Sequence, residues 1–361
     1  MVLKLQVKNK VAILPLFMKN IMRLAITMGD PGGIGPEIAL KAICRSSWPD
    51  PARFILIGDA NTWGRCARKL KLPRPCECKN IGETDNNKVS VWDPEASSSA
   101  ISAGAKTARK NWRAGRTGKS EGAASLLWIR AAAAGCLAGA FDGMVTSPIC
   151  KSSIQAAGCG FPGHTEYLAH LASARKVGMM LMGGPLRVIL ATRHVPIKLV
   201  PRMLTRGALI EAIEMASLAV KWLGLPQKPI GVCGLNPHAG DNGMLGAEEK
   251  TIIAPVIGQL RKRGLEIDGI IPGDVIFHQA LENKFGAIVA MYHDQGLGPL
   301  KMLFFDRGVN LTLGLPFVRT SPDHGTAFDI AGKGIASSES MAEAIKLAIK
   351  LARRPNPWKQ A

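Results

Sequence analysis

Residues 287–301 read AIVAMYHDQGLGPLK, and this stretch decides which fold class the sequence fits. The run at 287–290 is short, apolar and uncharged, as expected of a buried strand. His293 and Asp294 follow it closely, and Lys301 comes after two glycines. Ligands of α/β proteins bind beyond the carboxyl ends of the strands. We therefore predict that this one turn supplies a metal ligand, an acid or base and an anion-binding cation.

Apolar runs of the same kind recur along the chain and alternate with helical segments, a pattern that predicts an α/β fold. The predicted strands lie at residues 24–27, 54–57, 89–92, 143–146, 187–191, 230–233, 287–290 and 309–314. Two of the predicted helices end near residues 42 and 70, and three others span 120–138, 246–263 and 338–351.

His194, His238 and His293 each follow one of these apolar runs. Neutral imidazole is the commonest metal ligand, and three rings from three strand ends can close around a divalent ion while leaving a position open for substrate. A structural role remains the alternative for each histidine. Arg319 also follows an apolar run, so we expect several strands to deliver side chains to one crevice.

The composition is that of a globular enzyme with many tight connections, because 47% of the 361 residues are hydrophobic and 39 glycines and 23 prolines are spread along the chain. This length allows two domains, or one large α/β unit with a subdomain.

No run reaches the roughly 18 uncharged apolar residues of a membrane span. Eight cysteines without a CxxC pair do not form a disulfide framework or a zinc ribbon. We therefore expect a cytoplasmic protein.

The net charge of +19 raises the possibility of nucleic-acid binding. The basic residues lie mostly on predicted helix faces, for example between Lys106 and Lys119, and no aromatic residues are interleaved with them as stacking platforms. We favour a solvated basic surface that also attracts anionic substrates, and keep nucleic-acid binding as the alternative.

The two ends of the chain lie outside the predicted core. Residues 1–22 hold an apolar run that Pro15 interrupts, and no small-residue cleavage site follows, so a signal peptide is not expected. Because the strand pattern begins at Leu24, we expect residues 1–22 to be a disordered, dispensable extension or the result of a start site placed too early. Residues 353–361 are expected to form a C-terminal tail.

Three glycine-containing loops could contact a ligand. Residues 29–37 read GDPGGIGPE, but the third glycine of a dinucleotide fingerprint would fall at Ile38, so this loop is either a tight turn or a substrate or phosphate loop. His164 and Thr165 stand at a predicted helix start, where backbone amides suit a phosphate. The loop at 323–334 could wrap an adenosine.

Six segments taken together resemble the 4-hydroxythreonine-4-phosphate dehydrogenase family of pyridoxal phosphate biosynthesis. They are MGDPGGIGPEI at 28–38, FPGHTEYLA at 161–169, CGLNPHAGDNG at 233–243, AMYHDQGLGPLK at 290–301, VNLTLGLPF at 309–317 and RTSPDHGTAFDIAGKG at 319–334. The likeness runs from about Leu24 to Ala352. The last segment also resembles the nucleotide loop of isocitrate and isopropylmalate dehydrogenases, which bind NAD or NADP without a Rossmann fingerprint.

The resemblance implies a two-domain α/β/α architecture of the isocitrate and isopropylmalate dehydrogenase type, with the active site in the cleft between the domains. Residues 23–352 would form this unit from two discontinuous subdomains. The resemblance also implies a homodimer in which one metal ligand comes from the neighbouring subunit, and we expect His293 to be that ligand.

The resemblance further implies roles for individual residues. The metal ligands would be His194, His238 and His293. The substrate would be bound by His164, Thr165, Lys301, Asn310 and Arg319. The candidate proton handlers are His164, Asp274 and Asp294. The cofactor would contact His324, Gly325, Thr326, Asp329 and Gly332.

The implied function is NAD-dependent oxidation and decarboxylation of 4-(phosphooxy)-threonine to 3-amino-2-oxopropyl phosphate, with NADP as a possible replacement for NAD and with zinc, magnesium or cobalt as the metal. Related enzymes act on threonate or erythronate 4-phosphate or on aromatic cis-dihydrodiols, so the motifs do not fix the substrate. A metal-dependent phosphate-ester hydrolase and a nucleic-acid-binding protein remain alternatives of other classes.

Overall fold

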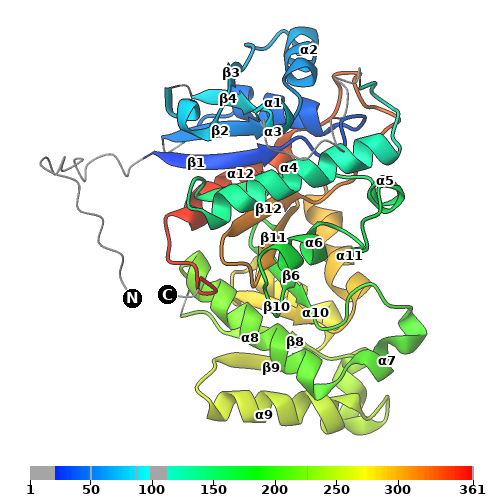
Figure 1. Ribbon diagram of the computed structural model, residues 1–361. Coiled ribbons are helices and arrows are strands. Elements are labelled where there is room, and N and C mark those ends of the chain that lie inside the picture. The colour runs from blue at the N-terminus through cyan, green and yellow to red at the C-terminus, as the bar shows by residue number, and fades with distance from the viewer. Residues whose placement is uncertain (1–20, 49–50, 87, 98–111, 226, 360–361) are drawn as a thin grey trace, which may run out of the picture.

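One mixed sheet runs through the part of the chain that the computed structural model describes, namely residues 21–359 without 49–50, 87, 98–111 and 226. In spatial order its strands are β3 (Cys76–Cys78), β4 (Val89–Trp92), β2 (Ala52–Ile57), β1 (Met22–Thr27), β5 (Gly143–Thr146), β12 (Val318–Pro322), β11 (Val309–Leu313), β6 (Gly178–Gly183), β7 (Leu186–Leu190), β10 (Ala287–Ala290), β8 (Ile230–Cys233) and β9 (Ile267–Ile271). In Figure 1 the strands β1–β4 lie at one end of the molecule and β8 and β9 at the other, with β11 and β12 between them.

The two outer parts of this sheet are parallel, and the middle is antiparallel. The strands from β3 to β12 pair in parallel, as do those from β7 to β9. The strand β11 pairs antiparallel with both β12 and β6, and β6 pairs antiparallel with β7. The parallel parts therefore run in opposite directions and meet at β11 and β6.

Helices cover both faces of the sheet. The side chains of a strand point alternately to its two faces, yet every residue from Leu24 to Thr27 in β1 and all of β5 are buried. The helices are α1 (Gly35–Arg45), α2 (Ala60–Leu70), α3 (Pro94–Ser97), α4 (Lys119–Leu137), α5 (Lys151–Ala156), α6 (His164–Leu171), α7 (Val200–Met203), α8 (Arg206–Leu223), α9 (Ala254–Lys262), α10 (Gly273–Leu281), α11 (His293–Phe304) and α12 (Glu339–Ala352). The prediction of an α/β fold is thus confirmed.

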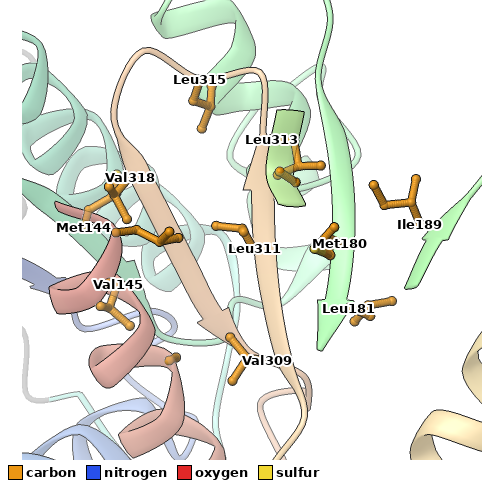
Figure 2. Packing of buried hydrophobic residues seen from close by; sticks show 14 of the residues in the cluster. Met144, Val145, Met180, Leu181, Ile189, Val309, Leu311, Leu313, Leu315 and Val318 are labelled. Carbon is orange, nitrogen blue, oxygen red and sulfur yellow. The ribbon is translucent and has the colours of Figure 1, made fainter. Parts of the chain in front are cut away.

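The middle strands have one largely apolar face and one face of mixed polarity. In β11, Leu311 is opposite Met180 of β6 and Thr320 of β12, whose hydroxyl donates to a carbonyl of α12. Figure 2 shows Leu311 and Met180 among the packed side chains of this apolar face. The alternate residue, Asn310, is opposite Leu181 and Ser321 and points to the other face. This face carries polar side chains of β12 and β11 and the apolar Met179 and Leu181 of β6, and we call it the floor.

Several elements differ from the sequence predictions. The strands β3, β6, β9 and β12 were not predicted, and residues 249–253 form a π-helix, η4 (Glu249–Ile253), where an α-helix was expected. The turn predicted after β10 is the helix α11, which contains Pro299. Gly296 lets this helix approach the sheet, since a Cβ there would lie 2.7 Å from Cγ1 of Val188.

The structure describes the C-terminal end of the chain up to residue 359, but not the first 20 residues. Residues 1–20 lie outside the described residues, and β1 begins at Met22. The predicted C-terminal tail packs on the body, because the ring of Trp358 lies 5.6 Å from that of Trp222 and Asn356 donates to a carbonyl 3.1 Å away. The division into two subdomains stays a prediction.

Candidate active site

A cavity of about 620 Å3 opens over the floor of the sheet. Its walls come from α5, the start of α6, the segments after β5, β7 and β12, and α11. The predicted site residues that line it are His164, Thr165, His194, His293, Lys301, Asn310, Arg319, His324 and Gly325. The expectation of one crevice is therefore confirmed for these residues, although Asn310 and Arg319 project from the faces of strands rather than from their ends.

Arg319 places a cation on the floor that is only 3% exposed. Among the described residues its hydrogen bonds go to hydroxyls alone: Nε and Nη2 donate to Thr146 Oγ1 over 3.1 and 2.6 Å, and Nη1 donates to Thr312 Oγ1 over 2.8 Å. Burial lowers the pKa of Arg319 to about 10. A buried charge is costly unless it is paired. This guanidinium is therefore suited to an anionic ligand.

His164 begins α6 beside Arg319, and its Nε2 is buried without a hydrogen-bond partner. Burial, and then the charge of Arg319, lowers the pKa of His164 well below its ordinary value, so the ring is neutral at pH 7. Asn310 Oδ1 is a second buried polar atom of the cavity without a partner. Buried polar groups are normally hydrogen-bonded, so these atoms indicate that a polar ligand completes the site.

His194 and His293 form a pair in the cavity, with ring centroids 5.5 Å apart. Burial, and then the neighbouring His293, lowers the pKa of His194, which favours the neutral form that binds metals. The carboxylate of Asp294 lies 2.7 Å from Nδ1 of His293, an arrangement that fixes a metal-binding ring and leaves Nε2 for the metal.

The third predicted metal ligand, His238, is exposed and does not line the cavity. It lies in η3 (Pro237–Gly243), after β8. No group of three or more histidine, cysteine or acidic side chains that could hold a metal occurs within the described part of this single chain. His293 lines the cavity of its own chain, so the expectation that it serves the neighbouring subunit does not fit this geometry.

Two predicted proton handlers lie outside the cavity lining. Asp294 is 89% exposed and orients His293, and Asp274 is exposed in the first turn of α10. Their catalytic roles stay predictions. Lys301 does line the cavity and faces Asp323, with Nζ 3.4 Å from Oδ2. Burial raises the pKa of Asp323, and Lys301 acts in the opposite direction.

The predicted cofactor loop begins at the cavity, where His324 and Gly325 line its wall. Nε2 of His324 is buried without a partner. Further along, Thr326 accepts a hydrogen bond from the backbone of Ile34 over 3.0 Å, and a Cβ on Gly33 would lie 3.0 Å from its carbonyl oxygen. The loop at 29–37 is therefore a tight turn that contacts the cofactor loop at Thr326 and supports it. No residue of 29–37 lines the cavity.

A buried ion pair fixes the far end of the cofactor loop. Lys41 Nζ donates to Glu37 Oε1 over 2.7 Å and to the carbonyls of Gly334 and Ala336 over 2.8 Å each. The Glu37 carboxylate in turn accepts from the backbone amides of Gly334 and Ala336. We call this network the loop clamp. Asp329 and Gly332 lie between it and the cavity in sequence, and their contacts with a cofactor stay predictions.

Sequence reasoning missed several cavity residues, among them Thr146, Lys151, Glu166 and Asp323. Thr146 was identifiable as the last residue of a predicted strand, and Asp323 as the first residue of the predicted loop. The strand β12 reads VRTSP, and its three consecutive polar residues gave no alternating pattern from which a two-faced strand could be predicted.

A family model described as "Pyridoxal phosphate biosynthetic protein PdxA" matches residues 50–348. The chain belongs to this family. The resemblance drawn from the six motifs is therefore confirmed. A PdxA relative named 4-hydroxythreonine-4-phosphate dehydrogenase, from Beijerinckia indica subsp. indica, is 42% identical over 339 residues, which cover 93% of this chain and 96% of that protein.

Other relatives show the range of names around the PdxA family. A protein named D-threonate 4-phosphate dehydrogenase, from Cupriavidus necator, is 38% identical over 92% of this chain and 97% of its own length. The crystal structure of 4-hydroxythreonine-4-phosphate dehydrogenase from Klebsiella pneumoniae matches with a TM-score of 0.79 and 37% identity, over 93% of this chain and 99% of that one. These names agree with the prediction of a dehydrogenase. Within the described residues, no helix is long and apolar enough to cross a membrane.

Proposed function

We propose that this protein oxidises and decarboxylates 4-(phosphooxy)-threonine to 3-amino-2-oxopropyl phosphate in pyridoxal phosphate biosynthesis, using NAD and a divalent metal ion. The observation that carries the proposal is the buried guanidinium of Arg319, which has only hydroxyl partners on the cavity floor. A substrate with a phosphate and a carboxylate would add negative charge to that of Glu166, which also acts on Arg319.

The charged side chains of the cavity suit such a substrate. Arg319 can bind an anionic group with two parallel hydrogen bonds, whereas Lys301 acts as a point charge. Thr165 is buried at the start of α6, where backbone amides suit a phosphate. Asn310 can bind through its unpartnered oxygen. Together these groups would bind and orient the substrate.

The pair His194 and His293 fits a divalent ion, because both rings face one cavity and Asp294 leaves Nε2 of His293 for a metal. When bound, such an ion stabilises negative charge on the substrate oxygen during both oxidation and decarboxylation. The residues of the chain would hold this site and exclude water from it.

The proton of the substrate hydroxyl needs an acceptor when hydride leaves the same carbon for nicotinamide. His164 is the candidate that we favour over Asp274 and Asp294, since it alone lines the cavity and is neutral. The resulting 3-oxo acid loses carbon dioxide. The loop at 323–334, held by the loop clamp, would bind NAD or NADP, and its approach to the cavity through His324 supports this role.

A homodimer would complete the metal site. Large apolar side chains are exposed near the cavity and near His238: Phe305 is 71% exposed and lines the cavity, Met302 is 86% exposed, and Met244 is 76% exposed. Burial of such side chains favours association. We propose that the partner subunit's His238 joins His194 and His293.

All eight cysteines are free thiols, which supports a reducing cytoplasmic setting.

Three alternatives use the same cavity. Threonate or erythronate 4-phosphate carries the same phosphate and carboxylate as the proposed substrate but a hydroxyl in place of its ammonium group, and the name of the Cupriavidus relative favours this alternative. An aromatic cis-dihydrodiol brings no phosphate to Arg319 and Lys301. A metal-dependent hydrolase would also use the histidines, but it has no use for a nucleotide loop.

A substrate panel tests the proposal. Reduced nicotinamide formation is measured with hydroxythreonine phosphate, threonate phosphate and erythronate phosphate, with NAD or NADP and with zinc, magnesium or cobalt. We expect the highest kcat/KM with hydroxythreonine phosphate. A higher value with threonate phosphate would instead support the sugar-acid alternative. Release of inorganic phosphate without reduced nicotinamide from any substrate would overturn the dehydrogenase assignment.

A further inference from the structure

His238 lies in a backbone turn of unusual conformation. The φ angles of His238, Ala239, Gly240, Asp241 and Asn242 are 51°, 53°, 82°, 40° and 54°. All five are in the left-handed region, which residues other than glycine rarely adopt. Such strained segments persist only where the surroundings hold them, and they cluster at functional sites. We call residues 238–242 the left-handed turn.

A single buried carboxylate, that of Glu249, holds the base of this turn. Glu249 is 4% exposed. Its Oε1 accepts from the backbone amides of Leu235 and Asn236 over 2.8 and 2.7 Å, and its Oε2 accepts from Asn236 Nδ2 over 3.0 Å. Burial alone would raise the pKa of Glu249, but these hydrogen bonds outweigh it and lower the pKa, so the carboxylate stays charged.

The carboxylate also lies directly against the left-handed turn. A Cβ on Gly240 would lie 2.6 Å from Glu249 Oε2, and a Cβ on Gly234 would lie 3.3 Å from Oε1. Glu249 opens the π-helix η4, whose wider turn precedes α9. Glu249 therefore holds the base of the turn, while Lys250 Nζ donates to the carbonyl of Asn242 at its end, and neither residue lines the cavity.

We infer that Glu249 is a positioning residue, which holds the left-handed turn so that His238 projects from the surface in the orientation needed to bind the metal. This inference rests on the proposed function, in which His238 completes the metal site. Glu249 itself would touch neither metal nor substrate.

The test compares metal and cofactor affinities in two variants that each alter a buried glutamate. Glu249→Gln keeps the shape of the side chain but places an amide against Asn236. Glu37→Gln alters the loop clamp in the same chemical way, at a glutamate that is 3% exposed. Affinity for Co2+ alone is measured by absorbance titration, and affinity for NADH alone by fluorescence.

We expect Glu249→Gln to raise the Kd for Co2+ at least tenfold, as is typical when a group that orients a metal ligand is lost, and to leave the Kd for NADH unchanged. The Glu37→Gln variant should raise the Kd for NADH and leave the Kd for Co2+ unchanged. Asn236→Ala removes one of the three hydrogen bonds to Glu249 and the hydrogen bond from Asn236 Nδ2 to Glu248. It should raise the Kd for Co2+ to a smaller degree and serves if Glu249→Gln does not fold.

The outcomes separate this inference from the proposed function. If the unaltered protein binds no Co2+, or if His238→Ala leaves its affinity unchanged, the proposed metal site fails. If His238→Ala weakens Co2+ binding but neither Glu249→Gln nor Asn236→Ala does, the positioning role alone is overturned. An equal loss of Co2+ and NADH affinity in Glu249→Gln would also contradict it, because that pattern indicates general destabilisation.

Discussion

The buried cation of Arg319 is a cost to the fold, which the proposed anionic substrate would offset. Its guanidinium is almost fully buried and, within the described part of the chain, is hydrogen-bonded only to Thr146 and Thr312. Replacing buried charge by an apolar side chain of similar volume is often stabilising. In the proposed function this residue serves binding at the expense of stability, as is common in active sites.

We therefore expect Arg319→Met to raise the free energy of unfolding by about 1–4 kcal/mol while it weakens substrate binding more than tenfold. Urea unfolding gives the first quantity, and the KM for the phosphorylated substrate gives the second. A less stable variant would show that the Arg319 hydrogen bonds contribute more than its burial costs.

The pKa of His164 makes stability depend on pH in a defined direction. Because the folded pKa is lowered, the unfolded chain binds a proton that the folded protein does not, so stability falls as the pH drops below the unfolded value of about 6.5. In His164→Gln this loss disappears. The difference in free energy of unfolding between the two proteins should thus change in favour of the variant from pH 7 to pH 5. A difference independent of pH would contradict the lowered pKa.

At the scale of elements, the sequence predicted the buried parallel strands well because a continuous apolar run of four to six residues is a strong local signal. It failed where tertiary contacts decide. The methionine-rich β6 has no polar side chain although Met179 and Leu181 line the cavity, and the strand β12, which carries Arg319, is mostly polar although it is buried. Two glycines and Pro299 argued against the helix α11, yet Gly296 is what allows its close packing on β7.

The candidate site was predictable only in part for a related reason. Residue type identified His164, His194, His293 and Lys301, but no local pattern showed that His238 lies away from them. Its position depends on the left-handed turn and on the distant Glu249, neither of which leaves a periodic signal in the sequence.

The loop clamp gives a prediction at the element scale. Lys41→Met removes the only cation that contacts the buried carboxylate of Glu37 among the described residues. Breaking a buried pair in this way costs about 3–5 kcal/mol. We expect a loss of stability of that size in urea unfolding and a higher Kd for NADH, because the cofactor loop loses its anchor. Lys69→Met, an exposed lysine on α2, is the control. An unchanged Kd for NADH in Lys41→Met would separate the clamp from cofactor binding.

At the scale of the whole molecule, the exposed apolar side chains around α11 predict association. Phe305→Glu places a charge where an apolar contact is proposed, so we expect the dimer to dissociate and Co2+ affinity to fall with it. Sedimentation at several protein concentrations measures the first effect, and absorbance titration measures the second. Leu137→Glu, at the end of α4 and 49% exposed, is the matched control. A monomeric variant with full Co2+ affinity would show that the metal site lies within one chain.

The strands that form the floor have two different faces, and this has a consequence for engineering. Along β11, β6 and β12, consecutive residues belong alternately to the core and to the cavity, as with Leu311 and Asn310. A library restricted to Met179, Leu181, Asn310 and Ser321 would therefore vary the surface that meets the substrate and leave the intervening core positions untouched. New substrate preferences could be selected on this scaffold by changing alternate residues, without redesigning the fold.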